Sequence, residues 1–255
     1  MYLADLQANI LRWVWRLRRE PTTLIVDLLQ PVLWLILFGH LFTFATAGLG
    51  LHVSYLTFMT AGVVVMTVFN AALAGGLEIM FDRESGMLRR LMVTPMHRST
   101  LLAGRFLFVV LIGLAQVMVI LGAGRLLGVP LHEGFVGLLL VLLFDTLLGT
   151  GTGIATLSLV LAFRLRNHGP FYTIIGFVSL PLTFISTALA PLHTMSGWLR
   201  TLAGLNPLTY AIDAVRSIVL QHAAVSGIVH LGIYLLVFDG LCLIIGVSVF
   251  RRALY

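Results

Sequence analysis

The chain alternates between long apolar stretches and short segments that carry most of its charge. Six apolar stretches are long enough to cross a bilayer, because a helical span needs about 20 residues. These stretches lie at 22–44, 54–78, 100–124, 135–163, 170–191 and 227–250. An even number of spans places both ends of the chain on one side of the membrane. We therefore expect an all-α integral membrane fold, with residues 22–255 forming one six-span transmembrane domain.

Residues 1–21 precede the first span and follow a different pattern. Apolar residues recur every three or four positions on one face, and polar residues do so on the other face. The two sets are Leu3, Leu6, Ile10, Trp13 and Leu17 against Asp5, Asn9, Arg12, Arg16 and Arg19. This pattern predicts an amphipathic helix in the membrane surface, with its arginines towards the lipid headgroups. The alternative is a helix docked on protein.

The most charged stretch is FDRESGMLRRLMVTP, residues 81–95, between the second and third spans. Its acids come first and its arginines later, an order that complements the dipole of a helix over 81–92. The residues concerned are Asp82 and Glu84, then Arg89 and Arg90, with Phe81, Leu88, Leu91 and Met92 on an apolar side. Pro95 disfavours helix beyond this point. An exposed apolar side on a short cytosolic helix favours a protein partner, and the alternative is a loop that only fixes topology.

The outer segment 192–226 predicts short helices at the outer leaflet. Asn206 can cap a helix there, and Pro207 suits the first helical position. Its apolar stripe consists of Leu208, Ile212, Val215 and Val219. Asp213 and Arg216 are three positions apart and can form an ion pair. The helix is too short to cross the membrane and return, so we expect it to dip into the outer leaflet or lie on it.

Composition and charge support a membrane protein. The mean hydropathy is +1.04 and 10% of the residues are charged, whereas a soluble domain carries about 25%. Of the 16 basic residues, all arginine, only Arg125, Arg200 and Arg216 fall in outer segments when the N-terminus is inside. This asymmetry predicts cytosolic termini and explains the net charge of +6 without nucleic acid. Because lysine is absent, the sequence contains no lysine-bearing phosphate-binding loop.

Two acids, Asp145 and Asp239, fall deep within the fourth and sixth predicted spans. A membrane-buried acid is a functional candidate, and the alternative is an acid that is protonated or bonded to a neighbouring side chain. In the fourth span, Gly149 and Gly153 form a small face that suits close helix packing. The single cysteine, Cys242, excludes an intramolecular disulfide, and the spacing of the histidines predicts no metal site.

Four stretches, taken in order, resemble a known family. They are the N-terminal surface helix, residues 30–42, residues 81–105 and residues 188–220. The matching positions are Glu84, Gly86, Leu88, Leu91, Thr94, Pro95, Pro191, Trp198, Asn206, Pro207, Tyr210 and Arg216. The chain resembles the membrane permease of type-2 ATP-binding-cassette (ABC) exporters, in the branch of nodulation-factor and daunorubicin-type export permeases.

The resemblance implies that the helix at 81–95 is a coupling helix, which docks on a separate ABC ATPase subunit. The residues implied in this contact are Arg83, Glu84, Gly86, Leu88, Arg89, Arg90, Leu91 and Pro95. It also implies two ATPase subunits that bind ATP and magnesium, and no cofactor on the permease itself. The further partners are a second copy or a sister permease, and the lipids of a bacterial cytoplasmic membrane.

The leading hypothesis is therefore an export permease whose substrate passes between two permeases, near spans 1, 2 and 5. The sparse polar residues favour a lipid-like, amphipathic or hydrophobic drug-like substrate, with a glycan or glycolipid as the competitor. A second hypothesis is a proton-coupled secondary transporter that uses Asp145 and Asp239. A third is a membrane enzyme, although no nucleophile–base or paired-acid spacing supports it.

Overall fold

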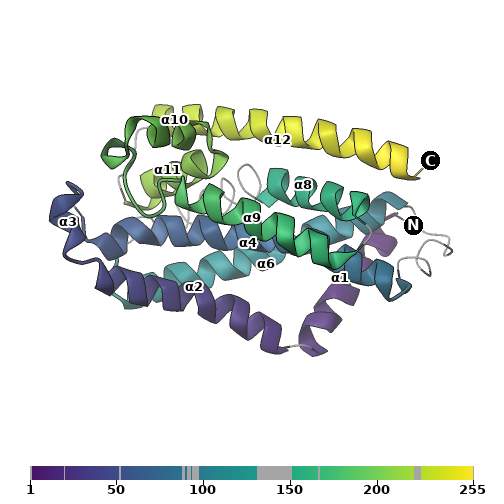
Figure 1. Cartoon of the computed structure of the whole chain (residues 1–255). Helices are drawn as coiled ribbons and strands as arrows, with labels where there is room; N and C mark the ends of the chain where they lie inside the picture. Colours follow the sequence, from purple (N-terminus) through teal and green to yellow (C-terminus); the bar gives the residue numbers. More distant parts are fainter. Residues whose placement is uncertain are drawn as a thin grey trace.

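The computed structural model describes residues 2–19, 21–51, 53–87, 90, 93, 98–130, 151–165, 167–220 and 225–254. Within these residues every regular element is a helix, and no strand is present. In chain order the elements are α1 (Tyr2–Arg19), α2 (Pro21–Leu41), α3 (Ala45–Gly48), α4 (Tyr55–Glu84), α6 (Arg98–Leu126), α8 (Gly151–Arg164), α9 (His168–Phe184), the 3-10 helix η2 (Leu192–Thr194), α10 (Gly197–Leu205), α11 (Pro207–Leu220) and α12 (Val225–Leu254). They form an elongated bundle, with α12 along one side and α2 along the opposite side (Figure 1).

Three helices in the described part are long and apolar enough to span a membrane, over Tyr55–Glu84, Leu107–Leu126 and Val229–Val249. They confirm the second, third and sixth predicted spans. Two shorter apolar helices, Ile25–Leu41 and Gly151–Arg164, match the first span and the end of the fourth. Residues 131–150, which include Asp145 and most of the fourth predicted span, lie outside the described residues.

Helix α4 is the central element of the bundle. Helices α2, α6, α8 and α11 all pack against it, and Val64, Val65 and Phe69 are fully buried at its middle. A helix that is apolar on all sides is stable when other helices cover it, as here. Its first turn is capped by Ser54, whose hydroxyl accepts a hydrogen bond from Thr57 N at 3.2 Å.

The fifth predicted span ends earlier than expected, because α9 stops at Phe184 instead of continuing to residue 191. Pro181 lies in its last turn, and its carbonyl accepts from Ile185 N at 2.8 Å where the helix ends. The chain then folds over α4, and a Cβ atom added at Gly62 would lie 2.9 Å from Ala188 O. The turn after α9 therefore packs on α4 at a position where only glycine fits.

Helix α1 docks on the bundle through Asn9 and Arg12, two residues of its predicted polar face, whereas Arg19 of that face is exposed. The place of α1 in the membrane surface stays a prediction. Asn9 is 3% exposed and packs on α6, where a Cβ added at Gly104 would lie 3.0 Å from Asn9 Cβ. Arg12 Nη1 donates to Asp82 Oδ2 of α4 at 3.0 Å. The buried Asp82 requires a polar partner, and α1 provides it. Trp15, on another side of α1, is exposed.

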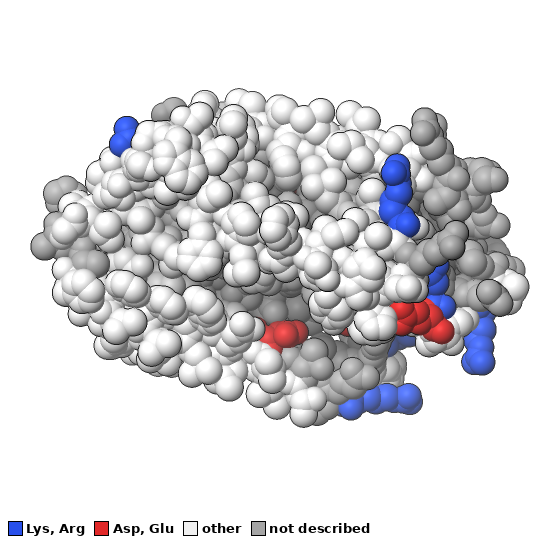
Figure 2. Space-filling view, in the orientation of Figure 1, with Lys and Arg blue, Asp and Glu red and all other residues white. Residues whose placement is uncertain are grey.

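Charge separates the two ends of the bundle. Helix α1 and the last turns of α12 lie at the same end (Figure 1), as an even number of spans predicts. Figure 2 shows that basic side chains gather at this end on the face drawn, while the middle of the face is nearly uncharged. This end is called the inner end below, and the end that holds α10 is called the outer end.

Candidate coupling and translocation sites

The first candidate site is the inner end of α4, where the charged stretch 81–95 begins. Residues 81–84 form the last turn of α4 instead of starting a new helix, which corrects the predicted start. Gly86 ends the helix with a φ of 72°, and its N–H bonds to Arg83 O at 3.1 Å. A left-handed glycine after the last turn is a common helix stop, because it has no Cβ to clash.

Helical structure resumes directly after this stop. Arg90 N donates to Gly86 O at 3.2 Å, which closes a helical turn, and the side chain of Arg90 is exposed. Four of the predicted contact residues, Leu88, Arg89, Leu91 and Pro95, lie outside the described residues. The inner end of α4 therefore carries a sharp turn at Gly86, followed by a charged segment.

Two residues predicted to contact the ATPase, Arg83 and Glu84, form bonds within this chain. Arg83 Nη1 donates to Leu165 O at 3.0 Å, and His168 Nδ1 bonds to the Glu84 carboxylate oxygens at 2.8 and 3.1 Å. The Phe81 and His168 rings lie 5.8 Å apart. These three interactions, called the inner clamp below, fasten the end of α4 to the connection between α8 and α9.

His168 is the residue of the inner clamp that the sequence did not point to. It lies 84 positions from Glu84, so no local spacing relates the two side chains. The only available signal is its place in the short charged connection RLRNH between two apolar stretches. Such a connection lies on the same side of the membrane as the 81–95 stretch, and this makes a contact between them feasible.

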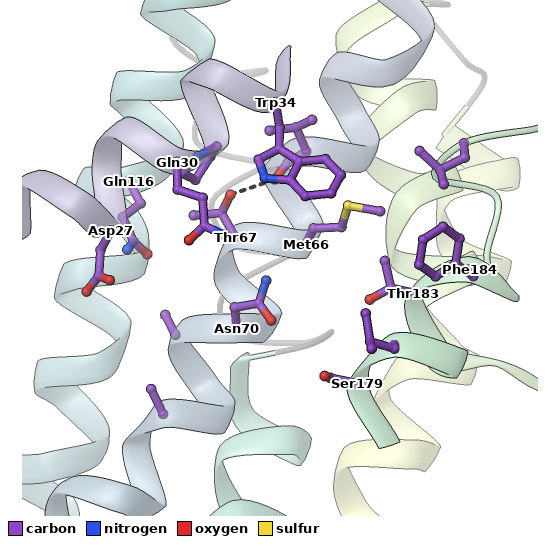
Figure 3. A pocket seen from close by; sticks show the side chains of 16 residues that line it. Asp27, Gln30, Trp34, Met66, Thr67, Asn70, Gln116, Ser179, Thr183 and Phe184 are labelled. Atoms are coloured by element: carbon purple, nitrogen blue, oxygen red, sulfur yellow. Dashed lines mark hydrogen bonds between the residues drawn. The ribbon is translucent and has the colours of Figure 1, made fainter. Parts of the chain in front are cut away.

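The second candidate site is a cavity of about 320 Å³ between α2, α4, α6 and α9. Asp27, Gln30 and Gln116 lie on one side of it, across from Thr183 and Phe184 of α9 (Figure 3). Its other lining residues are mostly apolar. Its walls include the helices of the first, second and fifth predicted spans, where we expected substrate to pass.

The outer segment is organised around Asn206. Its side-chain oxygen accepts from Leu208 N at 3.0 Å and so caps α11, which begins at Pro207 as predicted. Its amide group donates to Leu182 O at 2.7 Å and to Ile185 O at 3.2 Å. These carbonyls belong to the end of α9, where helical partners are missing. The Asn206 side chain therefore caps both the end of α9 and the start of α11.

Asp213 and Arg216 form the predicted ion pair, with Arg216 Nη1 2.9 Å from Asp213 Oδ1. Thr187 completes the group: its hydroxyl donates to Asp213 Oδ1 at 2.9 Å, and its carbonyl accepts from Arg216 Nη2 at 2.7 Å. The guanidinium also lies 3.9 Å from the centre of the Phe58 ring of α4. This group, called the outer lock below, holds α11 against α4 and the turn after α9.

Helix α11 is buried further than an outer-leaflet helix requires. Its predicted apolar stripe of Leu208, Ile212, Val215 and Val219 is at most 4% exposed, and it packs between α4 and α12. Pro191 is buried at the start of η2. Trp198, by contrast, is 69% exposed on α10. The outer residues therefore divide into a packed group and one exposed tryptophan.

Asp239, the buried acid of α12, lies against α8. It is 4% exposed, and a Cβ added at Gly153 would lie 2.5 Å from Asp239 Oδ1. The expected close packing at Gly153 is confirmed. The Asp239 carboxylate lies where a side chain at position 153 would be. Asp145 and Gly149 are outside the described residues, so the structure does not relate the two acids.

Comparisons with known proteins agree with this architecture. The model of a family described as ABC-2 type transporter, for its membrane part, matches residues 4–220. The putative transport permease ycf38 of Pyropia yezoensis is 40% identical, over 84% of this chain and 73% of the relative. The match to a membrane part agrees with the expectation that this lysine-free sequence does not itself hydrolyse ATP.

More distant relatives include a resistance transporter and a nodulation protein. The probable doxorubicin resistance ABC transporter permease protein DrrC of Mycobacterium tuberculosis (strain ATCC 25618 / H37Rv) is 27% identical, over 97% of this chain and 88% of the relative. Nodulation protein J of Rhizobium leguminosarum bv. trifolii is 25% identical, over 91% of this chain and 86% of the relative. Permeases of this family work with ATPase subunits. The chain therefore belongs to the ABC-2 type transporter family, as a multi-pass membrane permease subunit.

Proposed function

We infer that the chain is the permease subunit of an ATP-driven exporter. Two ATPase subunits bind ATP and magnesium, and a second copy or a sister permease completes the membrane part. Six spans cross a bacterial cytoplasmic membrane and place both termini in the cytosol. Residues 1–21 form an amphipathic helix before the first span. The basic side chains at the inner end support this orientation (Figure 2).

The observation that carries the proposal is the way the inner clamp joins the charged segment to the cavity walls. Arg83 and Glu84, at the end of α4, hold the α8–α9 connection through Leu165 and His168. Helices α4 and α9 both line the cavity. A displacement of the segment after Gly86 would therefore move two walls of the cavity together.

Within this mechanism the predicted coupling residues take two roles. Leu88, Arg89, Arg90, Leu91 and Pro95 lie beyond the turn at Gly86, and we assign to them the contact with the ATPase. Arg83 and Glu84 instead link that contact to α8 and α9, because their side chains already bond within the chain. The ATPase contact thus acts on the cavity through the inner clamp.

The cavity supports an amphipathic substrate that is lipid-like or drug-like. Polar groups such as Asp27 and Gln116 share it with Trp34 and Phe184, and such a mixed lining suits a molecule with a polar and an apolar part. The names of the doxorubicin resistance and nodulation relatives agree with export of such molecules. A glycan or glycolipid remains the competing substrate.

A proton-coupled secondary transporter is the second candidate, because Asp239 is a buried acid in a membrane helix. Transport by the permease–ATPase complex in proteoliposomes separates the two functions. The exporter requires ATP and works without a pH gradient, and Asp239→Asn retains transport. Transport that is driven by a pH gradient without ATP, and is lost in Asp239→Asn with normal assembly, would overturn the proposal.

A further inference from the structure

We propose that the cavity between α2, α4, α6 and α9 binds the protonated amine of an amphipathic organic molecule, with the Asp27 carboxylate as its counter-ion. This inference rests on the proposed function, which places the cavity on the substrate path. It adds the chemical class of the substrate.

Two acceptors of the cavity lining have no donor among the described residues. Asp27 is exposed to the cavity, and its carboxylate makes no hydrogen bond to the described residues. Gln116 is 4% exposed, and its buried Oε1 atom also finds no donor in that part of the chain. A carboxylate only accepts hydrogen bonds. A ligand that brings N–H groups into the cavity satisfies the Asp27 carboxylate.

Two hydroxyl groups of the lining can accept a hydrogen bond from a ligand. Thr67 donates its proton to Val63 O at 2.7 Å (Figure 3), and Ser179 donates to Gly176 O at 3.4 Å. Each proton is therefore used within its own helix, and the oxygen lone pairs remain available. The donors of the lining, which include the side-chain amides, the Trp34 indole N–H and the Thr183 hydroxyl, are neutral. The preference for a cation therefore comes from the charge of Asp27.

The charge of the cavity has the sign that attracts a cation. Among its described lining residues none is an arginine or a histidine. Glu78 lies close enough to Asp27 to interact with it electrostatically. Figure 2 shows acidic atoms in a hollow of the nearly uncharged middle of the face, away from the basic inner end. A carboxylate or phosphate ligand would be repelled by Asp27 at short range.

Apolar and aromatic surface lies beside these acceptors. Trp34 is 41% exposed and stacks on Phe38 with ring centres 4.8 Å apart, which fixes the plane of its indole ring. An aromatic face attracts an organic cation and also packs on a flat apolar body. Met66, Leu180 and Phe184 extend this surface. The cavity thus offers an acceptor-rich side for an amine and an apolar side for its attached group.

Three dansyl-labelled probes of similar size test the proposal on the purified permease–ATPase complex in phosphatidylcholine nanodiscs. Dansylcadaverine carries a primary amine, its N-acetyl derivative is neutral, and dansyl-6-aminohexanoic acid is an anion. Fluorescence titration should show that the amine binds at least about tenfold more tightly than the neutral probe, as expected for a charge paired in a partly buried site. The anion should bind most weakly.

Variants of Asp27 assign the preference to the cavity. Asp27→Asn should weaken amine binding about tenfold while binding of the neutral probe stays the same, and Asp27→Glu should retain most of the preference. The matched control is Asp5→Asn, at an acid of α1 that does not line the cavity, which should not alter the ratio of the two affinities.

Competition by phosphatidylethanolamine identifies the source of the amine. If this lipid displaces dansylcadaverine only when Asp27 is present, the natural ligand is a lipid headgroup; if it does not, the ligand is a freely diffusing amphiphile. Both results retain the proposal. Equal binding of all three probes, tighter binding of the anion, or unchanged selectivity in Asp27→Asn would overturn it. ATP-driven transport by the same complex in proteoliposomes would show that the exporter function stands even then.

Discussion

The two ends of α4 are fastened in opposite ways. At the outer end, Arg216 is nearly enclosed and contacts Asp213, Thr187 and the Phe58 ring. At the inner end, Glu84 and His168 pair in an exposed position, with side-chain exposures of 37% and 50%. A buried charge holds its partner tightly because its loss strands the other charge, whereas an exposed pair is weak. The outer lock therefore anchors the bundle, and the inner clamp can open and close.

The outer lock offers the largest expected effect. Arg216→Ala leaves Asp213 without its cation and removes the bond to Thr187 O. We expect a loss of about 2–4 kcal/mol in the free energy of unfolding, less than for a fully buried pair because the Asp213 side chain is 36% exposed. Thermal unfolding of the purified protein measures the change. Arg125→Ala, at an exposed arginine in the last turn of α6, is the control. An unchanged melting temperature in Arg216→Ala would show that the lock does not anchor α11.

Asn206 should come second, because it bonds to the end of α9 and to the start of α11. Asn206→Ala removes the cap on Leu208 N and the donors to Leu182 O and Ile185 O. We expect a loss of about 1–3 kcal/mol in the free energy of unfolding. Asn206→Ser keeps a hydroxyl that can cap Leu208 N but loses the amide donors, so its unfolding temperature should fall between those of the parent and the alanine variant. Equal stability of Asn206→Ser and Asn206→Ala would contradict the double role.

Gly86 should show a smaller change that is confined to the inner end. Its φ of 72° costs a non-glycine residue about 1 kcal/mol. A Cβ atom there meets nothing within 4 Å, so the cost comes from the backbone alone. Gly86→Ala should reduce ATP-driven transport, and Gly86→Asn should reduce it less, because asparagine tolerates this conformation better. Equal transport by the parent and both variants would mean that the turn does not position the segment.

The inner clamp should show the smallest effect on stability. His168→Ala breaks an exposed pair, so the unfolding temperature should barely change. Transport per ATP hydrolysed should nevertheless fall, because the end of α4 is no longer fixed to α9. Glu84→Gln tests the same contact from the other side, and the double variant should resemble either single one. A marked loss of stability, or additive losses of transport, would contradict a shared coupling role.

The parts of this fold that local patterns specify were predictable from the sequence. The buried stripe of α11 follows from its three- and four-residue spacing, and Asn206 and Pro207 mark its start. Contacts between distant segments were not predictable in this way. The polar face of α1 looked suited to lipid headgroups because the buried position of Asp82 was unknown. The charge order of residues 81–92 suggested a separate helix, whereas helix α4 itself continues to Glu84.

The two candidate sites differ in the same respect. Residues of the coupling stretch were recognisable because they are contiguous, although the link from Glu84 to His168 was not. The cavity draws Asp27, Asn70, Gln116 and Thr183 from four helices, and each of these residues alone looks like an isolated polar group in an apolar span. Their shared position arises only when the helices pack. The sequence therefore points to the charged segment 81–95 more directly than to the cavity, and the coupling role of this segment stays a prediction.

Co-purification of an ATPase subunit with a Leu91→Asp variant tests the central claim most directly. The claim is that the segment beyond Gly86 receives the motion of a separate ATPase. A leucine seated at the centre of such a contact is worth about 2 kcal/mol or more, so the variant should lose the ATPase and transport while its abundance in the membrane stays normal. Thr201→Asp, which adds the same charge to the outer segment, should retain both. A Leu91→Asp protein that keeps its ATPase and transports at the parent rate would contradict the account.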